Sequence, residues 1–507
     1  MLCGELLRLS AERFPDKPAL IDGGRRLTYR EFDRAANRAA QALLALGLRK
    51  GSRAAILATN SIEFAVLYFG AARAGIILTT LTTRATPRDL VYMLTKISAE
   101  ALFYAEPLAA TAQAAADQAP SVQHRIGLGE KNFAAFMARG RDEAPAIGLD
   151  VDDPLAMTFT GGTTGFPKGV LVTHRARYTT AVTCGVEFGI DERDICMVAT
   201  PMFHAAGLFV WFQPAVMLGC TCVLQGSWDA ERFIDLVERH AVTATLLVPT
   251  QLGDLIAHPA FSQDRLRTLR NVNYAGAPMP LALYDRLTEA LPDVAFTENY
   301  GQSETGPMTI RRAFHPHDRR ASSGRPPHNV ETKVVDPEGR EVAPGVPGEI
   351  VTRGTHLLKE YWGEPEQTAA LFRSGDGWLW TGDIGMRDAD GFITLVDRSK
   401  DMIVSGGENI YPTEIENAFF EHEAVLECAV FGIPDERLGE VPAAHVVLRA
   451  SVAVTDETLI AFIAGRIARH KRPRLVKLVE SLPKTAIGKV QKNVIRAAYW
   501  QGRSRAI

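Results

Sequence analysis

The stretch "TFTGGTTGFPKGV", residues 158–170, contains four glycines and four threonines and closes with Pro-Lys-Gly-Val. It follows a β-type run, "LAMTFT" (155–160), and precedes "THRARYTTAV" (173–182), which has a pattern that can start a helix. Glycines let successive backbone N–H groups turn toward an anion, threonine hydroxyls add donors, and Lys168 supplies a positive charge. We therefore interpret the stretch as a phosphate-binding loop within an α/β chain.

The loop is not a Walker A motif, because Lys168 is preceded by proline and followed by glycine instead of lying in Gly-Lys-Ser/Thr. A P-loop phosphotransferase is therefore disfavoured. A flexible surface loop remains the alternative as long as this cluster of glycines and threonines is considered alone.

Apolar β-type segments alternate with helical patterns through the first two-thirds of the chain. The predicted strands are 54–60, 77–81, 194–200, 221–224 and 244–249, and the predicted helices include 61–75, with Ser61 as N-cap, and 229–240. This alternation is typical of an α/β fold with doubly wound, mostly parallel sheets. A chain of 507 residues is longer than one ordinary domain, so we expect two or more.

The sequence pattern changes near residue 320. Residues 334–354 combine short β-type runs with Gly and Pro, which predicts a β-rich subdomain with tight turns. Shorter α and β elements then follow and end in a helix. We place a large N-terminal domain at 1–396, a hinge at 397–401 and a small, mobile α+β domain at 402–507.

The composition, 46% hydrophobic and 23% charged, is that of a folded globular protein. Lys plus Arg number 56 and Asp plus Glu 59, so charge gives no case for nucleic acid or an acidic membrane. The six cysteines are scattered without the spacing of zinc or redox pairs, so we expect free thiols in a reducing compartment. No signal-peptide pattern and no membrane-spanning apolar run appear, so we expect a cytoplasmic protein. The composition is also compatible with a homodimer.

Four further motifs follow the glycine-rich loop. They are "NYGQSETG" (299–306), "WTGDIG" (380–385), "DRSKDMIVSGGENIYPTEIE" (397–416) and "PKTAIGKVQK" (483–492). With the loop, they resemble the ANL superfamily of adenylate-forming enzymes, which includes acyl-CoA synthetases, nonribosomal adenylation domains and luciferases. Five motifs in one order are highly specific.

The resemblance implies an AMP-forming acid–thiol ligase, an acyl-CoA synthetase that uses ATP, Mg²⁺ and coenzyme A. A carboxylate attacks the α-phosphorus of ATP, which releases pyrophosphate and gives acyl-AMP, and a thiol then displaces AMP. Both steps concentrate negative charge, which cations and N–H donors must stabilise more in the transition state than in the ground state.

The resemblance also implies which residues bind the nucleotide. Those expected at the β- and γ-phosphates are Thr160, Thr163, Thr164, Gly165 and Lys168. The other expected nucleotide-binding residues are Asn299, Tyr300 against the adenine, Ser303, Asp383 at both ribose hydroxyls and Arg398 close to the same sugar. Glu304 would be the magnesium ligand, because a hard cation prefers oxygen. The family commonly has a serine at Gly161, so we expect differently tuned ATP binding.

The small domain would supply the remaining catalytic group, Lys489, which would bridge the attacking carboxylate and the α-phosphate. Members of the family rotate the small domain after adenylation, with Lys400 at the position of the hinge residue. The rotation would present Ser405, Gly406 and Gly407 to coenzyme A. Taken alone, Lys489 would most often be an exposed lysine, and a surface charge is nearly as good an explanation for Lys400.

By motif alignment, the acyl pocket is expected to be lined by His204, Ala206, Val210, Ala275, Gly276, Asn299, Gly301 and Met308. The segment 201–212 lacks the aspartate of amino-acid-activating relatives, which favours a plain carboxylic acid. Ala206 and Gly301 leave room for an aryl, cinnamate-type or medium-to-long alkyl acid rather than acetate. We also expect a role for His204 in catalysis, whereas a packed, hydrogen-bonded histidine is its structural alternative.

Coenzyme A is the expected thiol, because no carrier-protein domain follows and "GRSRAI" (502–507) lacks the Ser-Lys-Leu signal of luciferases. Two alternatives remain open. One is a stand-alone adenylating enzyme that loads a carrier protein, and the other is a non-catalytic nucleotide-binding sensor or scaffold. The presence of Lys489, Glu304 and Asp383 argues against the second.

Overall fold

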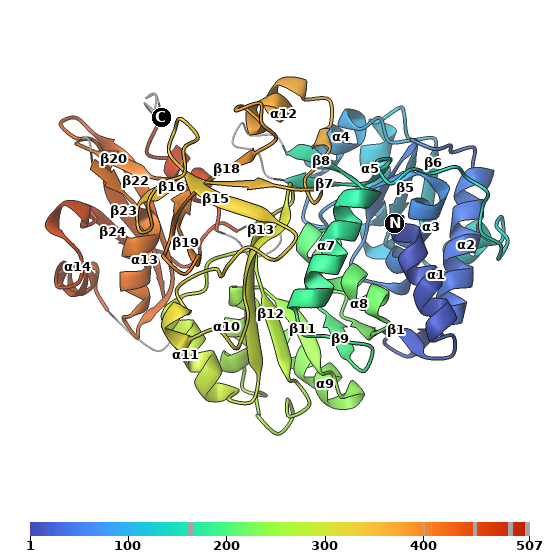
Figure 1. The fold of residues 1–507 in the computed structure, drawn as a ribbon, viewed down its shortest axis with the longest axis horizontal. Helices are drawn as coiled ribbons and strands as arrows, with labels where there is room; N and C mark the ends of the chain where they lie inside the picture. Colours follow the sequence, from blue (N-terminus) through green and yellow to red (C-terminus); the bar gives the residue numbers. More distant parts are fainter. Residues whose placement is uncertain (161–166, 399–400, 407, 450–453, 485–489, 502–507) are drawn as a thin grey trace.

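The computed structural model describes residues 1–160, 167–398, 401–406, 408–449, 454–484 and 490–501. Two large sheets with helices between and outside them form most of the molecule, and a β-rich sheet and a small C-terminal domain follow (Figure 1). The expected α/β architecture, with a large N-terminal and a small C-terminal domain, is confirmed.

The first large sheet has eight strands in the order β14-β13-β12-β11-β9-β10-β1-β2, parallel except for β2 and β14 at its edges. Its strands are β1 Pro18–Asp22, β2 Arg25–Thr28, β9 Ile195–Val198, β10 Thr221–Leu224, β11 Ala244–Leu247, β12 Asn271–Tyr274, β13 Ala295–Gln302 and β14 Gly306–Arg311. The predicted strands 194–200, 221–224 and 244–249 thus become neighbouring parallel strands β9, β10 and β11.

The second large sheet has seven strands in the order β17-β8-β7-β4-β3-β5-β6. Its strands are β3 Arg53–Leu57, β4 Ile77–Thr80, β5 Ala101–Tyr104, β6 His124–Gly127, β7 Pro154–Thr160, β8 Lys168–Thr173 and β17 Glu360–Tyr361. Strands β8 and β17 run antiparallel at one edge. The predicted phosphate loop therefore joins the last parallel strand of this sheet to its antiparallel edge.

One hydrophobic core joins the facing sides of the two sheets. It is filled by α1 Cys3–Arg13, α2 Tyr29–Ala45, α3 Ile62–Ala74, α7 His174–Glu187, the π-helix η2 Ala206–Phe212 and α8 Gln213–Leu218. The outer faces are covered by α9 Ala230–His240, α10 Pro249–Ala257 and α11 Leu281–Ala290 on one sheet, and by α4 Pro87–Lys96 and α5 Ala109–Asp117 on the other. Helix α6 Glu130–Met137 packs against α2 through this central core.

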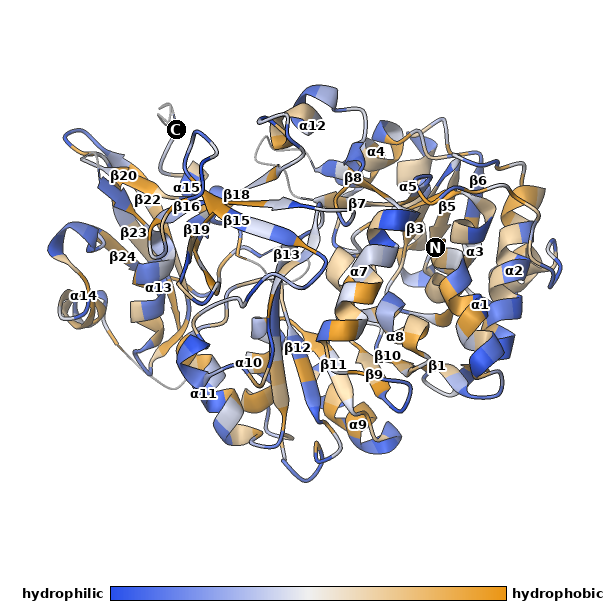
Figure 2. Cartoon of the chain, in the orientation of Figure 1, coloured by the Kyte–Doolittle hydropathy of each residue, from blue (hydrophilic) through white to orange (hydrophobic). Residues whose placement is uncertain are grey.

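The sequence explains why these helices begin where they do and which side they bury. Ser61 caps α3 by accepting a hydrogen bond from Phe64 N, as predicted, and Thr28 and Glu31 form a capping box at α2. Every residue of α3 is buried because it lies between the two sheets, whereas α2 has one hydrophobic and one hydrophilic side (Figure 2).

The β-rich part is an antiparallel sheet of β15 Glu331–Val335, β16 Pro347–Arg353, β18 Leu379–Arg387 and β19 Ile393–Arg398. The small domain contains β20 Ile403–Ser405, β21 Glu408–Ile410, α13 Pro412–Phe420, β22 Val425–Asp435, β23 Gly439–Leu448, α14 Asp456–Ala464, β24 Leu475–Leu478 and α15 Lys492–Ala497. Short helices elsewhere are η1 Glu106–Leu108, η3 His317–Arg319, α12 Pro365–Leu371 and η4 Arg469–Lys471. The predicted hinge, 397–401, begins with the last two residues of β19 and ends before β20, with Lys400 outside the described residues.

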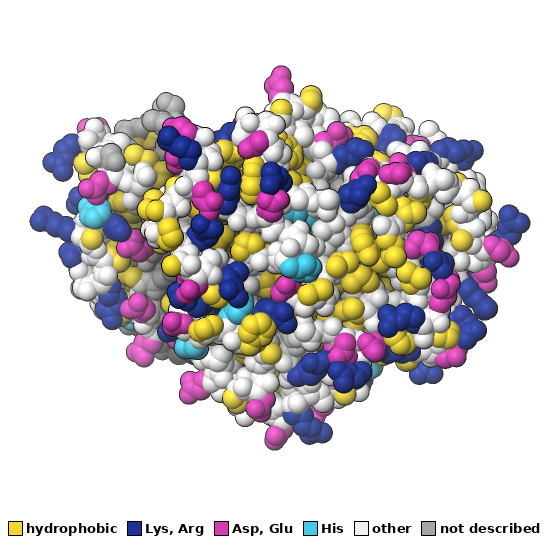
Figure 3. All heavy atoms as spheres, in the orientation of Figure 1, with side chains coloured by type: hydrophobic (Ala, Val, Ile, Leu, Met, Phe, Trp, Pro, Cys, Tyr) yellow, Lys and Arg dark blue, Asp and Glu magenta, His cyan; other side chains and the backbone are white. Residues whose placement is uncertain are grey.

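The surface and the cysteines agree with the expectations from composition. Basic and acidic side chains are interspersed over the face shown in Figure 3, in keeping with the net charge of −3. All six cysteines are free and buried. Over the residues that the structure describes, we find no helix of the length and hydropathy needed to cross a membrane.

Candidate active site

The predicted phosphate loop connects β7 and β8, which form an antiparallel hairpin. Thr160 and Lys168 are paired residues of this hairpin and lie on either side of the loop. Both residues therefore lie where the loop joins the two strands, a position that is compatible with the predicted role in binding phosphate. Thr163, Thr164 and Gly165 lie outside the described residues.

Tyr361 on β17 lies between Lys168 and Glu304. The Lys168 Nζ atom is 4.8 Å from the centre of the Tyr361 ring, and the Tyr361 hydroxyl donates a 2.8 Å hydrogen bond to Glu304 Oε1. Burial, followed by the nearby Glu304 carboxylate, raises the pKa of Tyr361 well above its usual value, which keeps the hydroxyl a donor. Tyr361 is not among the residues predicted from the sequence, because it lies outside the five motifs and no local pattern marks it.

Glu304 lies in the turn between β13 and β14 and is 9% exposed. The preceding carbonyl, that of Ser303, accepts a 3.1 Å hydrogen bond from Arg177 Nη2 on α7. Burial lowers the pKa of Arg177 to about 10, so the guanidinium stays charged at neutral pH. The guanidinium carbon of Arg177, Cζ, lies 5.1 Å from the centre of the Phe209 ring. A buried cation thus supports the turn that carries Glu304.

The Glu304 carboxylate fits a magnesium ligand. Mg²⁺ prefers oxygen donors and commonly combines one or two protein carboxylates with substrate phosphates. Within the described ranges, no group of three or more His, Cys, Asp or Glu could hold a metal ion.

Tyr300 and Gln302, on the same face of β13, both reach Asp383 on β18. The Tyr300 hydroxyl and the Gln302 side-chain amide each donate a 2.7 Å hydrogen bond to Asp383 Oδ2. Gln302 also donates to the Thr381 carbonyl at 2.9 Å. Asp383 is 5% exposed and pairs in register with Arg398 of β19, whose side chain lies outside the described part. Gln302 was not predicted from the sequence. Its spacing of two residues from Tyr300 places both side chains on the same face of a strand and could have indicated it.

His204 lies just before the π-helix η2, at the end of a loop fixed by Asn60. The Asn60 side-chain amide donates to the carbonyls of Val198, Thr200 and Gln225 at 3.0–3.2 Å. Its oxygen accepts a 2.7 Å hydrogen bond from Met202 N. Ala206 N donates to His204 Nδ1 at 3.2 Å, so one ring nitrogen of this partly buried histidine contacts backbone. π-Helical turns are frequent at functional sites.

The residues expected in the acyl pocket come from η2 and from the ends of β12, β13 and β14. Val210, Ala275, Asn299 and Met308 are buried, whereas Gly276 and Gly301 are exposed. Asn299 donates to the Tyr274 carbonyl at 3.3 Å, so its amide contacts backbone.

The expectation that Gly301 leaves room for the acyl group needs a correction. A Cβ atom at Gly301 would lie 1.9 Å from the Gly306 carbonyl oxygen of the paired strand β14. Backbone packing at the bulge between Tyr300 and Gly301 therefore requires glycine here. Gly301 thus does not by itself indicate a large substrate.

In the small domain, Ser405 ends β20 and pairs with Gly439 of β23. Gly406 has a φ of 61° and donates its N–H to the Leu438 carbonyl at 2.8 Å. Gly407, Lys400 and Lys489 lie outside the described residues. Lys484 and Val490, which flank the segment of Lys489, form an isolated antiparallel bridge.

The comparisons with known proteins agree with this arrangement. Residues 7–362 match the model of the AMP-binding enzyme family, and residues 414–489 match its C-terminal domain. The chain belongs to the AMP-binding enzyme family. The predicted membership of the adenylate-forming superfamily is thereby confirmed.

Two relatives of this AMP-binding enzyme match along almost their whole length. A feruloyl-CoA synthase from Amycolatopsis sp. is 35% identical over 491 residues, covering 96% of this chain and 97% of the relative. The fatty acid–[acyl-carrier-protein] ligase ScoC from Streptomyces coeruleorubidus is 33% identical, covering 98% and 96%.

A solved structure has the same fold. The anthranilate CoA ligase AuaEII in complex with anthranoyl-AMP superposes with a TM-score of 0.92 at 28% identity, covering 98% of this chain and 97% of that one.

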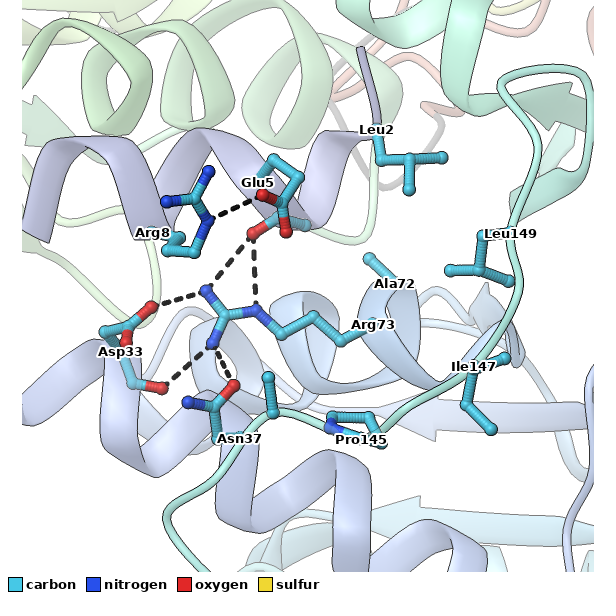
Figure 4. A pocket seen from close by; sticks show the side chains of 12 residues that line it. Leu2, Glu5, Arg8, Asp33, Asn37, Ala72, Arg73, Pro145, Ile147 and Leu149 are labelled. Carbon is cyan, nitrogen blue, oxygen red and sulfur yellow. Dashed lines mark hydrogen bonds and ion pairs between the residues drawn. The ribbon is translucent and has the colours of Figure 1, made fainter.

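The AMP-binding enzyme also has a cavity of about 100 Å³ beside α1. Figure 4 shows Arg73 among the residues that line it, and its guanidinium donates to the Gly4 carbonyl and to both Asp33 and Asn37. These bonds fix α1 against α2 and α3. We therefore assign this cavity a structural role.

Proposed function

We propose that this AMP-binding enzyme is an AMP-forming acid–thiol ligase. It activates an apolar carboxylic acid as acyl-AMP and transfers the acyl group to coenzyme A. The observation that carries the proposal is that Lys168 and Glu304 contact the same tyrosine, Tyr361. In addition, Tyr300 of β13, the strand that leads into the turn of Glu304, donates a hydrogen bond to Asp383 of β18. Binding a nucleoside triphosphate with its metal ion calls for a cation at the phosphates, a carboxylate at the metal, an aromatic ring at the base and a second carboxylate at the ribose.

In the first half-reaction, a carboxylate oxygen bonds to the α-phosphorus, and the bond from that phosphorus to the β-phosphate oxygen breaks. Pyrophosphate leaves with the electron pair. Lys168 and the hydroxyl of Thr160 hold the β- and γ-phosphates, and Lys489 approaches the α-phosphate and the attacking carboxylate. These groups stabilise the charge that develops on the phosphate oxygens.

Glu304 would hold Mg²⁺ together with the phosphates. When bound, the ion neutralises charge on the phosphate oxygens. The Asp383 carboxylate binds the ribose hydroxyls, oriented by its two donors, Tyr300 and Gln302. The Tyr300 ring lies against the adenine.

In the second half-reaction, the thiol sulfur bonds to the acyl carbon, the bond from that carbon to the AMP oxygen breaks, and the thiol proton passes to solvent. The small domain rotates about Lys400, so that Ser405, Gly406 and Gly407 approach the pantetheine. The division into a domain of 1–396 and one of 402–507 is part of this proposal.

The acid is an aryl, cinnamate-type or medium-to-long alkyl acid. Support comes from the buried apolar side chains Val210 and Met308 and from relatives whose names include feruloyl and fatty acid. Because ScoC is named as an acyl-carrier-protein ligase, transfer to a carrier protein is the second candidate.

The test is release of AMP and pyrophosphate by the purified protein with ATP, Mg²⁺ and coenzyme A. The panel contains acetate, octanoate, palmitate, benzoate and 4-coumarate. We expect AMP release with octanoate, palmitate or an aromatic acid, and little with acetate. Release of AMP with a carrier protein but not with coenzyme A favours the second candidate. Release of ADP, or ATP binding without turnover for every acid, contradicts the proposal.

A further inference from the structure

We propose that Tyr361 is a positioning residue of the phosphate site, whose hydroxyl orients the Glu304 carboxylate for the divalent cation that accompanies ATP. The inference rests on the proposed function, because it assigns Glu304 to the metal. It concerns a residue of the short strand β17, outside the five motifs.

The first observation is the direct contact. The Tyr361 hydroxyl donates to Glu304 Oε1 at 2.8 Å, and the tyrosine is 7% exposed. A hydrogen bond to an ionised carboxylate in a water-poor site is stronger than one between neutral groups. The bond therefore limits rotation of the carboxylate and fixes the direction in which its second oxygen points.

The second observation is that the segment 358–362, which contains β17, connects both sides of the site through its backbone. Leu358 N donates to the Glu304 carbonyl at 2.7 Å, and Trp362 N donates to the Gly169 carbonyl at 2.8 Å. Between these bonds, Tyr361 pairs with Val170. One short segment thus connects the turn of Glu304 with the strand that begins at Lys168.

The third observation concerns the ring. Lys168 Nζ lies 4.8 Å from its centre, so one aromatic side chain contacts the phosphate-binding cation with its face and the carboxylate with its hydroxyl. Lys168 and Glu304 are therefore positioned by the same structural element.

The decisive variant is Tyr361→Phe, which keeps the ring beneath Lys168 and removes only the hydroxyl. The probe is Mn²⁺ binding to the enzyme–ATP complex, followed by electron paramagnetic resonance. We expect the Mn²⁺ dissociation constant to rise roughly tenfold, the effect of one hydrogen bond to a charged group. We expect ATP affinity measured without a divalent cation to stay at the wild-type value. The Mg²⁺ concentration needed for ATP–pyrophosphate exchange should rise in parallel.

Tyr29→Phe is the matched control. Tyr29 is fully buried and donates to the Cys220 carbonyl at 2.6 Å in the central core. It should change thermal stability but not Mn²⁺ affinity. In a Glu304→Gln background, Tyr361→Phe should have no further effect on Mn²⁺ affinity, because the hydroxyl acts through that carboxylate.

Wild-type Mn²⁺ affinity in Tyr361→Phe would overturn the proposal. An equal loss of metal-free ATP affinity would also overturn it, since the tyrosine would then support the whole site. Failure of the proposed function is distinguishable from both outcomes. The wild type would then lack pyrophosphate exchange with every acid, while Mn²⁺–ATP binding would still report on Tyr361.

Discussion

The Tyr300 hydroxyl donates a 2.7 Å hydrogen bond to Oδ2 of Asp383, across 83 positions of sequence. Gln302 donates to the same oxygen at 2.7 Å. Two donors from β13 therefore hold a nearly buried carboxylate of β18 in one orientation, and they join the large parallel sheet to the β-rich sheet at the expected nucleotide site.

Asp383→Asn should weaken ATP binding with little effect on folding. The amide keeps the shape but loses the charge that strengthens hydrogen bonds to ribose hydroxyls, so we expect the ATP dissociation constant to rise roughly tenfold. Isothermal titration calorimetry with ATP measures it. Asp390→Asn is the control, since Asp390 is 63% exposed and pairs with Arg319. Equal ATP affinity in both variants would exclude Asp383 from nucleotide binding.

Lys489→Ala should separate the two half-reactions. Adenylation, measured as ATP–pyrophosphate exchange, should fall by at least two orders of magnitude, roughly the contribution of one group that stabilises transition-state charge. Thioester formation from supplied acyl-AMP should be partly retained, because we propose that this lysine acts only in the adenylating arrangement. Lys477→Ala, an exposed residue of β24, is the control. Equal loss of both half-reactions would contradict this division.

Asn60→Ala should destabilise the protein and disturb the acyl site. Asn60 satisfies three backbone carbonyls and one backbone N–H around the loop that leads to His204. Leaving such buried groups unpaired costs on the order of 2–4 kcal/mol of unfolding free energy. Urea denaturation measures the loss, and the KM for the acid should rise. Asn417→Ala, exposed on α13, should leave both unchanged. An unaltered urea midpoint in Asn60→Ala would refute this role.

Stability should fall as the pH drops from 6.5 toward 4, in part through His174. Burial lowers the pKa of His174 from 6.5 to about 4, and its Nδ1 accepts a hydrogen bond from Cys3 N. The unfolded chain therefore binds a proton in this range that the folded chain excludes. The stabilisation is present above pH 6.5 and is lost as the pH falls, by up to about 3 kcal/mol.

His174→Asn tests this prediction, because the asparagine oxygen can replace Nδ1 as acceptor but does not titrate. Its urea-unfolding free energy should depend less on pH than that of the wild type, with the remaining dependence including His356, whose pKa burial also lowers to about 4. His328→Asn, at an exposed position, should keep the wild-type pH dependence. Identical profiles for His174→Asn and wild type would exclude a contribution of His174.

Local patterns in the sequence predicted much of the fold correctly. Ser61 caps α3, the run 229–240 forms α9 Ala230–His240, and the predicted strands 221–224 and 244–249 lie in one parallel sheet. These features depend on side chains three or four positions apart and on apolar runs of strand length, so they can be predicted from the local sequence alone. The order of the five motifs likewise predicted the family.

The amino-acid sequence by itself determined the helix 61–75 with its cap, the strands 194–200, 221–224 and 244–249, and the five motifs whose order predicted the family. It did not predict that Lys168 begins a strand, β8, which forms a hairpin with β7. Only the tertiary structure decided that Tyr361 contacts Glu304, that Gln302 shares Asp383 with Tyr300, and that Gly301 is required by the Gly306 carbonyl. The physical reason is separation along the chain. The Tyr361–Glu304 contact spans 57 positions and exists because β17 adds to the edge of one sheet beside the end of another, which no local periodicity encodes.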